Sequence, residues 1–292
     1  MVLLATTAAI ISVMLWIISG TISKRIARGL GIYIVPFIIV TLGLAPMLIA
    51  TVLVGQYQLT LESVVVASVA GIFLSLGFIL AYKALETQKL ATTSAFGEIQ
   101  PAALVILGLL VFGEHITPVE IVGIIVIFIG ATLVITTEKF KINRGLLPAF
   151  LSNICWSFYW ILMTFSVISA GTYAFPLLIS RVAGMVIVVI YLLTNRRALA
   201  SLKGLGTKIK GSRTIAALVV LTIIAAFADA SGDTVFGITI SSTVLAVGGA
   251  LVALSPMITS FFGFLFYRER LRRIEIVGLL VMVSGALAVT VL

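Results

Sequence analysis

Ionisable residues that interrupt long apolar stretches are the first candidates for chemistry in this 292-residue chain. Arg181 lies in one such stretch, and Asp229 and Asp233 lie four positions apart in another, which places both carboxylates on one face of a helix. A charged side chain in lipid is costly, so it usually faces a partner, a protein interior or a water-filled path. Arg181 and Asp229 also fall at similar depths in their stretches, so we expect an ion pair that offsets the cost of both charges.

This charged group has two interpretations. Arg181, Asp229 and Asp233 could recognise a polar solute or exchange protons, or they could form a fixed structural ion pair. A fourth ionisable residue, Glu98, lies close to Pro101 in another apolar stretch. Glu98 could carry a proton as a neutral acid, or it could cap a helix that the proline interrupts. The sequence leaves both pairs of alternatives open.

Aromatic and amide side chains form a second group of candidate binding residues. Trp16, Tyr82, Trp156 and Trp160 all lie in apolar stretches, and Asn153 lies close to the last two. Aromatic rings can line a cavity or stack on a cation. A set that combines them with an amide would suit an amphipathic ligand, whereas the alternative is that these rings simply pack against other helices or lipid.

Proline and glycine mark two candidate hinges. Pro101 and Pro256 each remove a backbone hydrogen bond and can kink a helix. Gly97 lies beside the first proline, and Gly248 and Gly249 lie in the same stretch as the second. We expect hinges at these positions, with accommodation of neighbouring helices as the alternative role.

The composition shows what kind of element must position these residues. Hydrophobic residues make up 61% of the chain and charged residues 10%, far from the balance of a soluble domain. Apolar stretches long enough to cross a bilayer as helices fall at about 3–22, 32–54, 64–86, 90–112, 117–137, 145–169, 172–194, 214–236, 240–266 and 271–291. The sequence therefore predicts an all-α, polytopic membrane protein with ten transmembrane helices. The longest connection, from Asn195 to Arg213, is glycine-rich and basic.

Positive charge is distributed unevenly among the connections. The chain has 19 lysines and arginines, and all except Arg181 lie in or beside the first, third, fifth, seventh and ninth connections. Because positively charged loops stay on the cytoplasmic side, we expect these loops in the cytoplasm and both termini outside the cell membrane. No cation precedes the first stretch, which favours an uncleaved helix over a secretory signal.

The two halves of the chain repeat each other. An offset of 155 positions places residues 120–123 on residues 275–278, with Glu-Ile-Val-Gly in both, and an offset of 140 pairs Trp16 with Trp156. Two five-helix units follow, at 1–137 and 145–292, within a single membrane domain. Because five is odd, the second unit enters the membrane from the opposite side, which predicts an inverted repeat. Inverted repeats recur in secondary transporters.

The repeated module resembles a known family. Pro101…Glu114…Glu120…Gly130 and its second copy resemble the end of the repeat unit of the drug/metabolite transporter superfamily, in its ten-helix EamA branch. The resemblance implies a central cavity lined by helices one to four and six to nine, with helices five and ten at the periphery. It also implies a cargo such as an amino acid, nucleoside, sugar derivative or cationic drug.

Together these observations favour a secondary transporter over an enzyme. We expect it to move a small organic metabolite by alternating access, as an exporter or exchanger, with the proton as a candidate coupling ion. The alternatives are a flippase for lipid or lipid-linked sugar, an intramembrane enzyme or the permease subunit of an ATP-driven pump. Aspartyl intramembrane enzymes need two aspartates on facing helices, whereas Asp229 and Asp233 share one helix.

The expected partners follow from the same reasoning. We expect a small-molecule substrate, membrane lipid and no nucleic acid, because no segment is both basic and large. Neither a metal nor a cofactor is expected. The single cysteine, Cys155, excludes an intrachain disulfide framework. We expect a monomer or a homodimer.

Overall fold

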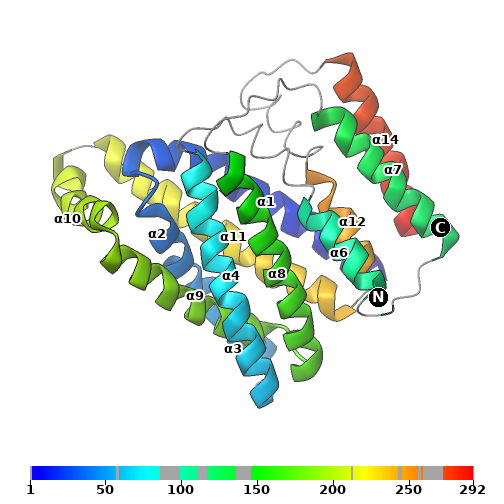
Figure 1. Ribbon diagram of the computed structural model, residues 1–292, viewed down its shortest axis with the longest axis horizontal. Helices are drawn as coiled ribbons and strands as arrows, with labels where there is room; N and C mark the ends of the chain where they lie inside the picture. Colours follow the sequence, from blue (N-terminus) through cyan, green and yellow to red (C-terminus); the bar gives the residue numbers. More distant parts are fainter. Residues whose placement is uncertain are drawn as a thin grey trace.

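The protein is an assembly of helices in the computed structural model (Figure 1). The structure describes residues 2–56, 59–85, 99–110, 113, 117–135, 146–211, 213–242, 245–255, 258 and 272–291. Within these ranges all regular elements are α-helices. They are α1 (Val2–Leu30), α2 (Val35–Leu42), α3 (Leu44–Val54), α4 (Leu61–Leu85), α6 (Ile99–Leu110), α7 (Pro118–Ile135), α8 (Leu146–Ala170), α9 (Ala174–Thr194), α10 (Arg196–Gly211), α11 (Arg213–Ser242), α12 (Leu245–Val252) and α14 (Arg273–Val291).

The described helices make this chain a multi-pass membrane protein. Six helical segments are long and apolar enough to cross a bilayer, and α7 and α14 contain shorter apolar segments. The predicted fourth and ninth spans, at 90–112 and 240–266, lie only partly within the described residues. The count of ten spans therefore stays a prediction.

The predicted second span is divided in two. Helices α2 and α3 are separated by Gly43, and Pro46 follows in the first turn of α3. A proline has no N–H to donate to the carbonyl of the preceding turn, and its ring clashes with that carbonyl. The continuous helix expected over 32–54 is therefore interrupted here. The break leaves Gly43, which has no side chain, facing the interior of the bundle.

The start of α7 shows how local sequence sets a helix end. The Glu120 N–H donates to Thr117 Oγ1 at 3.2 Å, and a Glu120 carboxylate oxygen accepts the Thr117 N–H at 2.7 Å. This reciprocal capping box satisfies backbone donors that have no partner inside the helix. Thr117 and Pro118 therefore mark a true boundary between elements, as the sequence predicts.

Three helix pairs make the most extensive contacts: α1 with α11, α4 with α8, and α7 with α14. The pair α7 and α14 lies at one end of the molecule, away from α2, α9 and α10 (Figure 1). A side chain on Gly130 would collide with the backbone of Gly278, and one on Gly285 would collide with that of Gly123. The glycines therefore let the two helices pack in close backbone contact.

The other two large pairs also share one packing feature. In α1 and α11, the Trp16 ring lies against Gly232, and in α8 and α4, the Trp156 ring lies against Gly77. A Cβ atom at either glycine would overlap the indole. Each tryptophan of the sequence repeat thus rests on a glycine of the partner helix.

Candidate functional site

The interior of the bundle holds a three-residue charged cluster. Arg181, on α9, is fully buried, and its Nη2 lies 2.7 Å from Asp229 Oδ2 on α11. Its Nη1 lies 3.3 Å from Asp233 Oδ2, one helical turn further along α11. One guanidinium therefore bridges two carboxylates on the same helix face, with a tight contact to Asp229 and a longer one to Asp233.

Two residues from the first half of the chain enclose the guanidinium. At the junction of α2 and α3, a Cβ atom on Gly43 would occupy the position of the Arg181 guanidinium. On α4, the Phe78 ring centroid lies 5.7 Å from Arg181 Cζ, within the range of a cation–π contact. The break after α2 thus provides space for the buried cation, and α4 provides an aromatic face.

Asp233 has a second hydrogen-bond donor from the first half. Trp16, on α1, donates from its indole Nε1 to Asp233 Oδ1 at 2.9 Å. The two oxygens of Asp233 therefore have different partners, an indole N–H and a guanidinium. A hydrogen bond to an ionised acceptor is stronger than a neutral one, so Trp16 helps to hold this carboxylate in place.

An aromatic cluster lies next to this hydrogen bond. The Trp16 centroid is 5.6 Å from that of Trp160 and 5.3 Å from that of Phe236. Trp160 and Phe236 are 4.6 Å apart in an edge-on arrangement, and Tyr159 meets Trp160 at 4.8 Å. Helices α1, α8 and α11 therefore contribute one continuous aromatic wall beside Asp233.

Four buried polar atoms of the described residues have no hydrogen-bond partner: Arg181 Nε, the Tyr159 hydroxyl, Thr41 Oγ1 and Thr172 Oγ1. A buried donor without a partner is unfavourable by about 1–3 kcal/mol. Arg181 Nε and the Tyr159 hydroxyl are both donors, so an acceptor group of a bound molecule, or a water, would satisfy them. The cluster therefore has hydrogen-bonding capacity that its own residues do not use.

The charged cluster joins residues that lie far apart in the sequence, and the sequence as a whole matches a known family. The sequence model of the EamA-like transporter family matches residues 3–136 and again residues 143–291. The chain belongs to the EamA-like transporter family. The two matched segments cover most of the chain and agree with the family that its repeated module resembles.

Two further comparisons give this EamA-family chain a context. A curated relative described as an uncharacterized transporter of Clostridium kluyveri is 28% identical over 135 residues, which are 45% of this chain and 43% of the relative. The match thus spans less than half of the relative's length. A solved crystal structure superposes with a TM-score of 0.69 at 16% identity, over 98% of this chain and 95% of that chain. At this identity the likeness shows the fold alone.

The remaining predicted binding residues are used differently. Trp156 contacts the Phe78 ring edge-on at 5.8 Å, so it packs against the ring that contacts the Arg181 guanidinium. Tyr82 donates its hydroxyl to Ser23 Oγ at 2.8 Å, and Asn153 donates its amide to the Ala149 carbonyl of its own helix at 2.9 Å. Neither hydrogen bond involves Arg181, Asp229 or Asp233.

The predicted hinges lie largely outside the part of the chain that the structure describes. Glu98, Gly97 and Pro256 are not among the described residues. Pro101 lies in the first turn of α6 as described, a place where helices tolerate proline. Gly248 and Gly249 lie in α12, which ends at Val252 before a turn. Their role as hinges stays a prediction.

Sequence reasoning missed three residues that shape the cluster: Gly43, Phe78 and Phe236. Gly43 had a usable signal, because a glycine three positions before Pro46 favours a helix break. Phe78 and Phe236 had none, since they are two of 17 phenylalanines in a uniformly apolar chain. Their roles depend on contacts between helices that the sequence does not specify.

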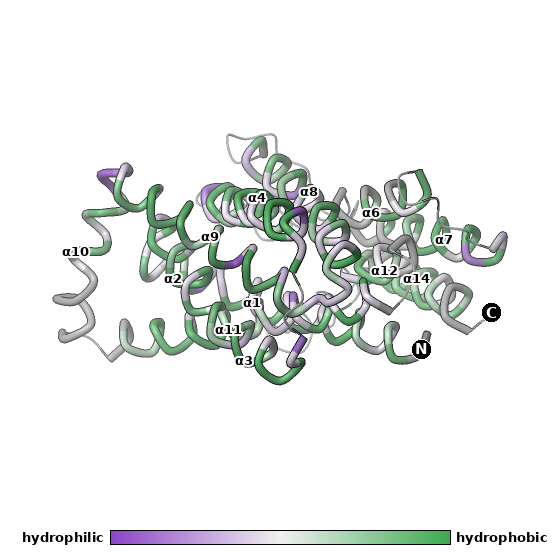
Figure 2. The backbone as a smooth tube through the Cα atoms, turned by 90° about the horizontal axis from the view of Figure 1, so that it is seen from below, coloured by the Kyte–Doolittle hydropathy of each residue, from purple (hydrophilic) through white to green (hydrophobic). Residues whose placement is uncertain are grey.

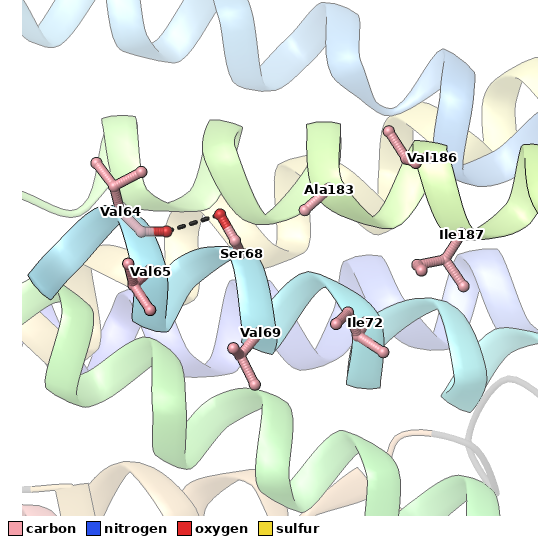
Figure 3. A pocket seen from close by; sticks show the side chains of 8 residues that line it. All are labelled: Val64, Val65, Ser68, Val69, Ile72, Ala183, Val186 and Ile187. Atoms are coloured by element: carbon pink, nitrogen blue, oxygen red, sulfur yellow. Dashed lines mark hydrogen bonds between the residues drawn. The ribbon is translucent and has the colours of Figure 1, made fainter. Parts of the chain in front are cut away.

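A separate apolar groove of about 440 Å³ lies between α4 and α9 (Figure 3). Its lining residues are Val64, Val65, Ser68, Val69, Ile72, Ala183, Val186 and Ile187. The one hydroxyl among them, that of Ser68, donates to the Val64 carbonyl of its own helix at 2.7 Å. The groove therefore offers apolar surface alone, which suits contact with lipid chains.

Proposed function

We propose that this membrane transporter is a secondary active transporter that moves a small organic metabolite across the cell membrane by alternating access, as an exporter or exchanger. The observation that carries the proposal is the buried cluster of Arg181, Asp229 and Asp233. Ionised residues inside a membrane bundle are rare, and they usually mark the path of a substrate or proton. EamA-family membership favours transport over catalysis.

The proposed fold comprises two inverted five-helix repeats with both termini outside. The reciprocal contacts support it: α1 packs on α11 as α8 packs on α4, with Trp16 on Gly232 and Trp156 on Gly77. A two-fold relation between halves would produce such exchanged pairs, and it would also pair α7 with its own counterpart α14. Two similar halves of opposite orientation can exchange conformations and expose one central site to either side.

The cluster also suggests how a substrate would bind. Arg181 Nε and the Tyr159 hydroxyl are unused donors that could meet a carboxylate, carbonyl or hydroxyl oxygen. We place the apolar or amine part of the substrate beside the rings of Trp16, Trp160 and Phe236, which lie next to Asp233. An amino acid, a nucleoside or an amine combines such groups in a molecule of suitable size.

Proton coupling is proposed from the charge balance. With both carboxylates ionised, the cluster holds one positive and two negative charges, so it carries an excess of one negative charge. Asp233 has the longer contact with Arg181, at 3.3 Å against 2.7 Å for Asp229. We therefore assign proton uptake to Asp233, whose neighbours are Arg181, Asp229, Trp16 and Tyr159. Glu98 is retained as a second candidate proton carrier.

Counterflow in proteoliposomes tests the proposal. Candidate amino acids, nucleosides and amines are first screened by thermal shift, and stabilising compounds are then assayed for exchange of labelled substrate. We expect flux in the parent protein and its loss in Arg181→Ala and Asp229→Ala. Arg273→Gln, at an exposed arginine that begins α14, is the matched control and should keep its flux. Normal flux in Arg181→Ala would show that the charged cluster is not the substrate site.

A flippase for lipid or lipid-linked sugar is the second candidate, because the groove between α4 and α9 is apolar and open to the surface (Figure 3). A flippase must also shelter a polar headgroup on its way across the bilayer. The one polar side chain in the groove, Ser68, has its hydroxyl bonded within its own helix. This lining favours the solute transporter over the flippase.

A further inference from the structure

Helix α10 differs in kind from the two helices that it connects. The predicted loop between Asn195 and Arg213 is instead a helix of 16 residues at one end of the molecule (Figures 1 and 2). On a helical projection its cations gather on one side: Arg196, Arg197, Lys203, Lys208 and Lys210. Most of its apolar residues gather on the other, with Leu199 at the border between the two sides: Ala198, Leu202, Leu205 and Ile209. This pattern is typical of helices that lie in the plane of a membrane surface.

The ends of the neighbouring membrane spans place α10 at the level of the membrane surface. The membrane-crossing part of α9 ends at Thr194, and that of α11 begins at Ala216. Between α9 and α10, Asn195 adopts an extended conformation, with φ −92° and ψ 107°, which breaks the helix. Its Oδ1 then accepts the N–H groups of Arg197 and Ala198 at 3.0 and 3.2 Å. The asparagine thus ends one helix and caps the next in a new direction.

In the first half of α10, where the side chains are described, the apolar side faces the protein and the charged side faces outward. Ala198 is fully buried and Leu202 packs partly against the main core, whereas Arg196 and Lys203 are exposed. Arg197 is also exposed, and its Nη1 donates to the Tyr33 hydroxyl at 3.2 Å. This bond ties α10 to the turn that follows α1.

The sequence on both sides of α10 carries positive charge and no negative charge. Residues 139–228 contain no Asp or Glu, and neither do residues 1–61. The end of α1 also carries an exposed cation, Arg25. These segments therefore provide no carboxylate that could pair with the cations of α10.

We propose that the basic face of α10 binds the anionic headgroups of phospholipids in the leaflet where α9 ends and α11 begins. Clustered lysines and arginines immediately beside a membrane span are attracted by anionic lipid. The helix is held against the bundle by Ala198 and Leu202, so its cations stay at the level of the headgroups. The binding surface does not depend on the proposed substrate site.

Native mass spectrometry of the full-length protein tests this proposal. The protein in detergent is titrated with phosphatidylglycerol or phosphatidylcholine of identical chains, and bound lipids are counted. We expect a preference for phosphatidylglycerol that falls at least roughly tenfold in the triple variant Arg196→Gln, Arg197→Gln, Lys203→Gln, because each surface cation contributes to the attraction. The charge-preserving variant Arg196→Lys, Arg197→Lys should keep the preference.

Several results would overturn the proposal. Equal binding of the two lipids by the parent protein would show that α10 serves another partner, such as an acidic protein. A preference that persists in the triple variant, or that falls equally in Arg273→Gln, would place the lipid elsewhere. A measurement on the parent protein alone avoids any folding defect of the variants. Raising the salt concentration should weaken the preference, and a preference insensitive to salt would contradict an electrostatic origin.

Discussion

The first and second halves of this transporter contribute different chemistry to one buried cluster. The offset of 155 positions pairs Asp233 with Phe78, and the offset of 140 pairs Arg181 with Thr41. The second half thus provides the guanidinium and the two carboxylates, whereas the first half has uncharged residues at the corresponding positions: Thr41, Leu74 and Phe78. Phe78 contacts Arg181 directly, because its ring lies against the guanidinium in a cation–π contact.

The tryptophans show the same contrast on a shared scaffold. Trp16 and Trp156 both rest on a glycine of the partner helix. The Trp16 indole donates to the carboxylate of Asp233, whereas Trp156 meets the edge of the Phe78 ring. Packing is therefore similar in the two halves and polarity is not. Duplicated helices can keep a common backbone arrangement while one copy alone acquires the charged groups.

Removal of the buried cation should produce the largest difference in stability between the two halves. Arg181→Ala leaves two buried carboxylates without their shared guanidinium, and breaking a buried ion pair costs about 3–5 kcal/mol. Thermal unfolding in detergent should show a large loss of stability. The first-half counterpart Thr41→Ala removes a hydroxyl that has no partner among the described residues, so its effect should be below about 1 kcal/mol. Similar effects of the two substitutions would contradict the asymmetry.

The two tryptophans should separate next. Trp16→Phe removes a hydrogen bond to a charged acceptor and should destabilise the protein by about 1.5–3 kcal/mol. Trp156→Phe loses ring area alone against Phe78 and should have a smaller effect. Chemical denaturation of both variants in the same detergent gives the comparison. Equal losses would mean that the bond between Trp16 and Asp233 contributes little.

Gly43 tests the space that the first half provides. Gly43→Ala places a methyl group where the Arg181 guanidinium lies, and overpacking of this kind costs about 1–3 kcal/mol. Gly20→Ala is the control, because a methyl group there meets no neighbouring atom within 4 Å. That variant should be as stable as the parent or slightly more so, since alanine favours a helix. Equal stability of Gly43→Ala and the parent in thermal unfolding would show that the guanidinium can shift freely.

The sequence predicts those parts of this site that depend on position along a single helix. The spacing of Asp229 and Asp233 puts them on one face, and the depth of Arg181 puts it level with Asp229. The bond from Trp16 to Asp233 joins residues 217 positions apart, and the position of Gly43 under the guanidinium depends on how α2, α9 and α11 pack. Such contacts require the tertiary arrangement, which apolar periodicity does not determine.

Helix α10 was missed for a different reason, which is local. Gly204 and Gly206 weaken helix propensity, and they favoured a loop between Asn195 and Arg213. The regular spacing of Leu199, Leu202 and Leu205 among cations was the opposing signal. Amphipathicity supported by packing against α9 and α11 outweighs the cost of two glycines.

Asp233→Asn makes the finest test, because it changes charge with little change in shape. The amide oxygen can still accept the indole N–H of Trp16, but the amide NH2 then faces Arg181 Nη1 and that hydrogen bond is lost. The cluster then holds one positive and one negative charge, which offsets part of the loss, so stability should change by about 1 kcal/mol. In the parent, a proton on Asp233 would balance the excess charge, and its release would free the carboxylate for an amine group. Exchange of an amine substrate should therefore rise with pH in the parent and become insensitive to pH in Asp233→Asn.

Glu98→Gln separates the two proposed proton carriers. If Glu98→Gln abolishes the pH dependence while Asp233→Asn preserves it, the coupling proton is carried by Glu98. The excess negative charge of the second half would then serve another purpose.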